Sequence, residues 1–228
     1  MITLNQIEDI VNKDGKFWIA FTGDSITSCE WVHPNWREIV EYVLKEELQK
    51  MYGENWRIPS WGLRGFNFAY DGATTKDVLE KTKDITLISP DLVVSVMGSN
   101  DRTRLSIEDH VNNIKSFSEQ VDTKVVWCTS SSFMSEQRNQ EYASFAKVSM
   151  QISENENLQL IDLFSVYKEF PIERLFTFKE DGGIDDTHPN QLGNAYIAKV
   201  ILKEVFGIDF DPELYWKDTL AGEKYSKY

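Results

Sequence analysis

Cysteine is scarce in this chain of 228 residues, which contains only Cys29 and Cys128. Two cysteines can form at most one bridge, so a disulfide framework is excluded as the organising device of the fold. Neither residue lies in a CxxC pair, which argues against a zinc or redox site. Cys128 lies within the apolar segment KVVWCTS and is expected to be a buried structural thiol.

Basic residues are few compared with acidic ones. The chain has 24 Lys and Arg against 37 Asp and Glu, which gives a formal net charge of −13. Such a surface repels phosphate backbones and anionic membranes, so we expect no nucleic-acid partner. Hydrophobic residues make up 41% of the chain and aromatic residues 13%, which is ample for a folded core and excludes a disordered chain.

Long apolar runs are also missing. None approaches the roughly 20 residues that a helix needs to cross a bilayer, so no transmembrane segment is expected. The start, MITLNQIEDIVNKDGK, lacks the basic residues and apolar stretch of a signal peptide, which predicts a cytoplasmic location. We expect one domain over residues 1–228, with a peripheral amphipathic helix at 1–14 and a peripheral tail at 212–228.

Short apolar runs alternate with longer helix-like patterns along the whole chain. Continuously apolar strands that alternate with helices predict an α/β fold with a mostly parallel sheet covered on both faces. In such sheets, sites form outside the carboxyl ends of the strands. The predicted strands are 16–21, 64–70, 91–98, 124–130 and 158–164, and the predicted helices are 34–51, 75–88, 106–120, 137–153 and 189–206.

Four polar clusters lie where this rule predicts a site. TGDS, DGATT and GSND follow the first three predicted strands, and DDTHPN precedes the last predicted helix. Because the carboxyl ends of parallel strands share one edge of the sheet, we expect these clusters to converge on one rim.

Ser25 is a candidate nucleophile, and His188 is the candidate for its base. A serine hydroxyl needs a base to attack at neutral pH, and the base needs an orienting partner. His188 precedes Pro189, which disfavours helical geometry at His188 and suits the first turn of a helix, so the ring is expected in a loop at the rim. Asp185 lies three residues earlier and can accept the Nδ1 proton, as in a Ser-His-Asp arrangement with Ser25. Asp186 is the substitute if the register shifts by one residue.

The other two histidines fit the role of base less well. His33 also precedes Pro-Asn, but no carboxylate lies three residues before it, so it is an alternative base or a residue of the pocket wall. His110 falls within the helical segment IEDHVNNI and is expected to be a surface or partly buried helix residue.

Acyl transfer also needs hydrogen-bond donors for the developing oxyanion, each worth roughly 3–4 kcal/mol in the transition state. The candidates are the backbone N–H groups of Ser25 and Gly72 and the side-chain amide of Asn100. Each also has a simpler interpretation. Ser25 and Gly72 suit tight turns, and Asn100 and Asp101 suit the cap of a following helix, which we expect to be the role of Asp101.

Taken in order, Gly23-Asp24-Ser25, the GATT segment at Gly72, Gly98-Ser99-Asn100-Asp101 and the Asp-x-x-His at 185–188 resemble the SGNH hydrolases, also called the GDSL esterase/lipase family. The resemblance implies a flavodoxin-like three-layer α/β/α fold with about five parallel strands. It also implies ester hydrolysis without a metal or organic cofactor.

Carried over by position, the resemblance makes Ser25 the nucleophile, His188 the base and Asp185 its orienting carboxylate. Gly72 and Asn100 then complete an oxyanion hole with the Ser25 amide. The chain reads GDSI where the family has GDSL, a conservative change. It also reads FAYDGATT where many relatives have a more polar sequence, which leaves the neighbouring substrate wall open.

Further residues near the predicted rim are candidates for substrate contact. Asp24 either contacts substrate or anchors the loop through backbone hydrogen bonds. Arg102, with Arg104, either meets an anionic or sugar substrate or forms a solvated pair. Five rim-proximal aromatic residues either contact substrate or belong to the core: Trp31, Trp36, Trp56, Trp61 and Phe66.

The sequence therefore predicts a serine esterase that removes a short acyl group, such as acetyl, from a carbohydrate or small alcohol. A lipase or an acyl-thioesterase of the same family is also open, since this scaffold fixes the reaction type and not the substrate. Two alternatives come from other classes: a metal-dependent phosphoesterase, because GDS, GSND and DDTH contain metal-ligating residue types, and a binding module without turnover.

Overall fold

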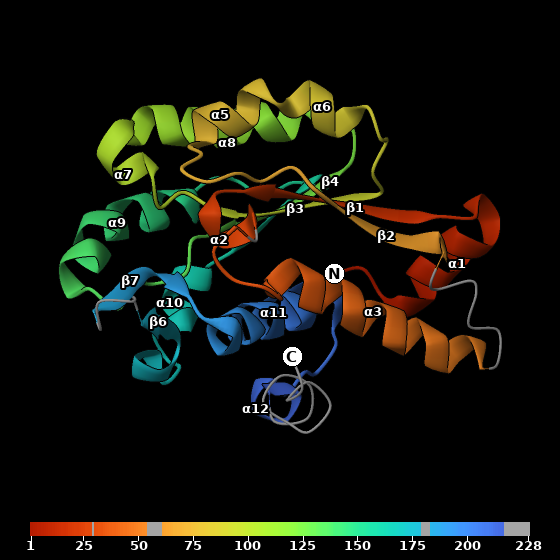
Figure 1. The fold of residues 1–228 in the computed structure, drawn as a ribbon. Helices are drawn as coiled ribbons and strands as arrows, with labels where there is room; N and C mark the ends of the chain where they lie inside the picture. The colour runs from red at the N-terminus through yellow and green to blue at the C-terminus, as the bar shows by residue number, and fades with distance from the viewer. Residues whose placement is uncertain (29, 54–60, 179–182, 217–228) are drawn as a thin grey trace.

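A parallel sheet forms the centre of the protein. The computed structural model describes residues 1–28, 30–53, 61–178 and 183–216. Five parallel strands lie in the order β2-β1-β3-β4-β5 (Figure 1). They are β1 (Phe17–Gly23), β2 (Leu63–Asn67), β3 (Leu92–Met97), β4 (Lys124–Thr129) and β5 (Leu158–Ile161). The predicted α/β fold with five parallel strands is confirmed.

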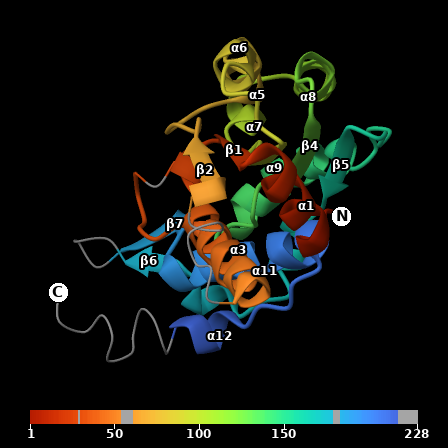
Figure 2. The same ribbon diagram turned by 90° about the vertical axis from the view of Figure 1, so that its right-hand side faces the viewer.

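Helices cover both faces of this sheet, which gives three layers (Figure 2). One face is covered by α1 (Leu4–Asp14), α3 (Trp36–Tyr52), α10 (Leu163–Tyr167) and α11 (Gln191–Phe206). The other face is covered by α5 (Thr75–Glu80), α6 (Thr82–Thr86) and α8 (Ile107–Gln120), and α9 (Glu136–Ser149) packs beside α8.

The helices on both faces explain why the strands of the sheet are apolar at consecutive positions. In β1, Ile19 and Phe21 pack into the cluster that contains α3 and α11, and Ala20 packs into the cluster on the opposite face. All three side chains are fully buried. Since neither face of the sheet meets water, the strands carry apolar residues at consecutive positions instead of alternating ones.

Two predicted elements have different boundaries in the structure. The predicted helix 75–88 is divided into α5 and α6, and the Thr82 hydroxyl at the junction donates to the carbonyl of Leu79. The predicted strand 158–164 ends at Ile161, because the carboxylate of Asp162 accepts the N–H of Ser165 and caps α10.

A short antiparallel hairpin lies outside the main sheet and was not predicted. It consists of β6 (Phe176–Phe178) and β7 (Ile184–Pro189). The segment IDDTHP forms β7, whereas the sequence predicts a loop around His188 because Pro189 follows it. Together with α2 (Ser25–Ser28) and α7 (Asp101–Arg104), β7 lies at the left of Figure 1. This is the edge at which the strands of the main sheet end.

The two ends of the described chain differ from each other. The segment 1–14, expected to be peripheral, contributes Ile7 and Val11 of α1 to the buried core. Near the other end, α12 (Pro212–Tyr215) is the last element, and most of the tail 212–228 lies outside the described residues. Over the described part of the chain, none of the helices combines the length and apolar character that a membrane crossing requires.

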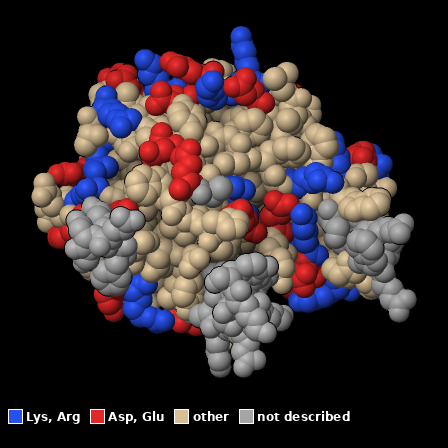
Figure 3. Space-filling model, in the orientation of Figure 1, with Lys and Arg blue, Asp and Glu red and all other residues tan. Residues whose placement is uncertain are grey.

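The structure also shows the setting of Cys128 and the distribution of charged side chains on one face. Cys128 is a free, buried thiol as predicted, and burial raises its pKa. Cys29 lies outside the described residues. On the face shown in Figure 3, acidic and basic side chains of the described residues are interspersed and do not form one continuous basic patch.

Candidate active site

Ser25 lies at the turn between β1 and α2, directly at the carboxyl edge of the sheet. Gly23 makes this turn possible. It has a φ of 147°, and a Cβ at this position would lie 2.4 Å from the carbonyl oxygen of Val96 in β3. Only glycine avoids this clash, so the chain can bring Ser25 close to the neighbouring strand.

His188 and Asp185 complete a hydrogen-bonded chain with Ser25. His188 Nε2 lies 3.0 Å from Ser25 Oγ, and His188 Nδ1 lies 2.8 Å from Asp185 Oδ2. The three side chains come from β7 and the β1–α2 turn, 163 positions apart in sequence. This is the geometry that a Ser-His-Asp arrangement requires, with the base within reach of the hydroxyl and the carboxylate behind it.

The surroundings of Asp185 keep its carboxylate charged. Burial alone would raise its pKa, but hydrogen bonds from the His188 ring and from the backbone N–H groups of Thr187 and His188 lower the pKa below its ordinary value. Asp186, the alternative carboxylate, points elsewhere: it lies 3.4 Å from Arg138 and accepts the hydroxyl of Thr187. The structure thus brings Asp185 to His188.

The predicted oxyanion donors lie at the ends of the two strands beside β1. The N–H groups of Phe68 and Tyr70 donate to Phe21 and Gly23, which holds the segment before Gly72 along the end of β1. Gly72 has a φ of 71°, a left-handed conformation that favours glycine. On the other side, Asn100 follows β3, and its side-chain amide donates to the carbonyl of Ala73 over 3.0 Å. A side-chain amide has two N–H donors, so one is left for a substrate oxygen.

Asp24 lies below this rim, not on it. Its side chain is completely buried, and it accepts the N–H of Ile26 and the hydroxyl of Ser99. Burial raises the pKa of Asp24 to about 7. Because Ser99 precedes Asn100, this carboxyl links the Ser25 turn to the Asn100 loop. The placement fits the loop-anchoring interpretation of Asp24, and its side chain has no surface to offer a substrate.

The other two predicted substrate contacts lie at different places. His33 is exposed, with Nδ1 3.0 Å from Glu38, and it lines a hollow of about 360 Å³ next to the site. Arg102 is largely engaged within the protein: it donates to the carbonyl of Ser99, lies 3.4 Å from Glu141 and covers the ring of Phe133. Arg104 donates to the carbonyl of Gly72.

The aromatic residues that were candidates for substrate contact lie in different parts of the protein. Trp36 belongs to the core, Trp61 is exposed, and Phe66 packs edge-on against Trp18. Trp56 lies outside the described residues.

Trp31 contacts the site directly, in a way the sequence did not indicate. Its ring stacks on the ring of His188, with centroids 4.1 Å apart and an angle of 7° between the planes. Its Nε1 donates to Asp71 over 3.2 Å, and about half of the residue is exposed. The position of Trp31, six residues after Ser25, was a signal for the rim but not for this stack.

His110 and Asp101 differ from expectation. His110 is completely buried, not at the surface, because its two ring nitrogens contact Asp101 and Ser149 in the interior. Asp101 does not cap the helix that follows it. Its carboxylate instead accepts the N–H and hydroxyl of Thr75 at the start of α5. Among the residues that the structure describes, no cluster of three or more His, Cys, Asp and Glu is arranged to hold a metal ion.

Comparison with known proteins agrees with this fold. Residues 21–196 match the sequence profile of the GDSL-like Lipase/Acylhydrolase family. No curated protein sequence matches the chain. Among solved structures, TesA superposes with a TM-score of 0.62 at 17% identity, covering 81% of this chain and 95% of TesA. Axe2, an acetylxylan esterase from Geobacillus stearothermophilus, superposes with a TM-score of 0.61 at 20% identity, covering 86% of this chain and 95% of Axe2.

The three-layer fold and the profile match together define a serine hydrolase that acts on ester bonds. The chain belongs to the GDSL-like lipase/acylhydrolase family, whose profile covers most of its length.

Proposed function

We propose that this protein is a serine esterase that removes a short acyl group, such as acetyl, from a carbohydrate or a small alcohol. The observation that carries the proposal is the hydrogen-bonded chain from Ser25 Oγ through His188 to Asp185, with separations of 3.0 and 2.8 Å. Both Ser25 and His188 line a small cavity, which shares Trp31 and Val32 with a wider hollow.

The reaction follows from the positions of these groups. His188 Nε2 takes the proton of Ser25 Oγ while the oxygen attacks the ester carbonyl carbon. The oxyanion of the tetrahedral intermediate is held by the N–H groups of Ser25 and Gly72 and by the amide of Asn100. His188 then gives its proton to the leaving alcohol, and an acyl group stays on Ser25. A water molecule, deprotonated by His188, releases the acid and restores Ser25.

The size of the cavity beside Ser25 supports a short acyl group. Among its lining residues are Ser25, His188, Trp31 and Val32. The volume of this cavity is about 10 Å³, which is room for about one water-sized group. A methyl group fits this space, whereas a long acyl chain needs the wall to move.

A second, wider hollow supports a polar alcohol part. It measures about 360 Å³ and shares Trp31 and Val32 with the cavity beside Ser25. The remaining walls are polar and come from His33, Thr177, Asn190 and Gln191. Amide, hydroxyl and imidazole groups beside an exposed indole suit the hydroxyls and apolar face of a sugar. The similar Axe2 is an acetylxylan esterase, which is consistent with this class.

The test is a hydrolysis screen over acyl esters of increasing chain length and over acetylated sugars, with Ser25→Ala as the inactive variant. We expect highest activity on acetyl esters, and a loss of at least about 10⁴-fold in kcat for Ser25→Ala. Ser118→Ala is the matched control, since Ser118 is 8% exposed like Ser25 but lies on α8. Ser118→Ala should keep full activity.

Other outcomes decide among the alternatives. Preference for long chains would favour a lipase, and preference for thioesters an acyl-thioesterase. Activity that a chelator removes and manganese or zinc restores would favour a metal-dependent phosphoesterase. Tight ligand binding without turnover over the whole panel would favour a binding module. Full activity of Ser25→Ala would contradict the proposal.

A further inference from the structure

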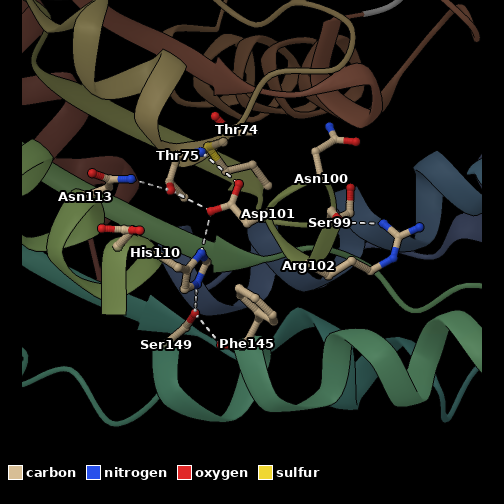
Figure 4. A network of polar contacts seen from close by, with 12 residues as sticks. Thr74, Thr75, Ser99, Asn100, Asp101, Arg102, His110, Asn113, Phe145 and Ser149 are labelled. Atoms are coloured by element: carbon tan, nitrogen blue, oxygen red, sulfur yellow. Dashed lines mark hydrogen bonds and ion pairs between the residues drawn. The ribbon is translucent and has the colours of Figure 1, made fainter. Parts of the chain in front are cut away.

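A second Ser-His-Asp set lies inside the protein (Figure 4). His110 Nδ1 lies 2.7 Å from Asp101 Oδ2, and His110 Nε2 lies 2.7 Å from Ser149 Oγ. Asp101, His110 and Ser149 are completely buried. No substrate can reach Ser149, so this set needs a different explanation from the one at the rim.

The carboxylate of Asp101 is the centre of this network. Oδ1 accepts the N–H of Thr75 over 3.0 Å, and Oδ2 accepts the Thr75 hydroxyl over 2.6 Å as well as contacting His110. Asn113 of α8 donates to the Thr75 hydroxyl over 3.1 Å. A buried carboxylate is costly unless hydrogen bonds compensate it, and here both oxygens are satisfied.

Asp101 and Thr75 belong to the two loops that carry the proposed oxyanion donors. Asp101 directly follows Asn100, and Thr75 follows Gly72 by three residues. Two further contacts cross between the same loops: the Asn100 amide donates to the Ala73 carbonyl, and Arg104 donates to the Gly72 carbonyl. Of the three links, the one through Asp101 is the buried one, and therefore the one protected from water.

His110 and Ser149 hold Asp101 from the opposite side. The Ser149 hydroxyl also contacts the Phe145 carbonyl of α9 over 2.9 Å, which fixes the far end of the chain of contacts. His110 packs directly against the turn before Asn100. Gly98 in this turn has a φ of 114°, and a Cβ there would lie 3.2 Å from His110 Cε1 and 2.9 Å from the Tyr142 hydroxyl. The turn and the ring are thus fitted to each other.

We infer that Asp101 is a positioning residue for the reaction: it fixes the separation between the Gly72 amide and the Asn100 amide, and His110 and Ser149 keep its carboxylate in place. The inference rests on the proposed function, since it assigns Asp101 to the oxyanion hole of that site. A donor must lie at hydrogen-bond distance from the developing oxyanion to lower the barrier. If the two loops move independently, the donors stay present but lose this alignment in the transition state.

The test compares Asp101→Ala with Asp91→Ala in the full-length protein. Asp91 is the matched control because it lies at the opposite end of β3, where its carboxylate accepts the N–H of Trp18 in β1 over 2.7 Å. On an acetyl ester, Asp101→Ala should lower kcat about 10- to 100-fold and leave KM within about threefold, as expected for an interaction used in the transition state. Asp91→Ala should keep kcat. Asp101→Asn, which retains the shape and one of the two acceptor oxygens, should restore part of the activity.

Amide hydrogen exchange gives a readout that does not depend on the esterase activity. Asp101→Ala should speed exchange at residues 70–75 and 98–102 together, and Asp91→Ala should leave both segments unchanged. Faster exchange in only one segment, or equal losses of kcat in the two variants, would overturn the inference. An inactive wild-type protein in which both segments still respond together would instead contradict the proposed function and leave the coupling of the loops established.

Discussion

The two Ser-His-Asp sets of this protein have nearly the same internal distances and very different settings. At the rim, His188 lies 3.0 Å from Ser25 and 2.8 Å from Asp185, and in the interior His110 lies 2.7 Å from both Ser149 and Asp101. The two sets differ in whether the serine borders a cavity and in which groups surround its hydroxyl.

Ser25 borders a cavity and is flanked by candidate oxyanion donors, whereas Ser149 ends α9 with its hydroxyl against a helix carbonyl. Hydrogen-bond geometry alone therefore does not identify a nucleophile.

The largest expected contrast between the two sets is chemical. A fluorophosphonate probe phosphonylates an activated serine at its oxygen and releases fluoride. It should label Ser25 completely and leave Ser149 unlabelled, because Ser149 is fully buried. Mass spectrometry of the digested protein measures this directly. Ser149→Ala should be labelled at Ser25 as in the wild type, and Ser25→Ala should carry no label. An adduct on Ser149 would remove the distinction between the two sets.

The next contrast concerns the two neighbouring carboxylates at the rim. Asp185→Ala should lower kcat about 10²- to 10⁴-fold, because the imidazolium formed at His188 loses its hydrogen-bonded carboxylate. Asp186→Ala should stay within about threefold of the wild type, since Asp186 contacts Arg138 and Thr187. Steady-state kinetics on an acetyl ester compares the two. A larger loss for Asp186→Ala would show that the orienting carboxylate is misassigned.

The smallest effect concerns stability and compares a rim carboxyl with a buried one. The pKa of Asp185 is lowered, whereas burial raises the pKa of Asp24 from 3.8 to about 7. Between pH 3.8 and about pH 7, the folded chain keeps the proton of Asp24 and the unfolded chain loses it. The free energy of unfolding therefore falls as the pH rises through this range. Asp24→Asn carries no such dependence, and its amide can still bond Ser99.

The stability of Asp24→Asn relative to the wild type should therefore increase from pH 4 to pH 8, by on the order of 3 kcal/mol. Urea unfolding at pH 4, 6 and 8 measures the difference. A difference that stays constant with pH would show that Asp24 is charged in the folded protein over this range.

Much of the fold and of the rim could be predicted because short stretches of sequence indicate the strands and the polar residues that follow them. Apolar runs define the five strands, and the edge where parallel strands end is fixed once their direction is fixed. For this reason the sequence could predict that Ser25 lies close to Asp185 and His188, although Ser25 and His188 are 163 positions apart. The hairpin of β6 and β7 was missed because its three-residue first strand and polar second strand give no such pattern.

Long-range packing explains what could not be predicted. His110 lies in a polar helical segment, IEDHVNNI, that is typical of a surface helix, and its ring is buried by contacts with α9 and with the loop of Gly98 and Asp101. Asp101 has the residue type of a helix cap, and its true partner, Thr75, is 26 positions away. The stack of Trp31 on His188 likewise depends on β7, whose position the sequence does not encode locally.

That stack gives the protein a built-in optical reporter. The indole of Trp31 and the imidazole of His188 are parallel with centroids 4.1 Å apart, so a change at the His188 ring alters the surroundings of a fluorescent side chain. The fluorescence of Trp31, isolated by subtracting the signal of Trp31→Phe, therefore reports on the surroundings of the His188 ring. It can be read on the time scale of a single turnover.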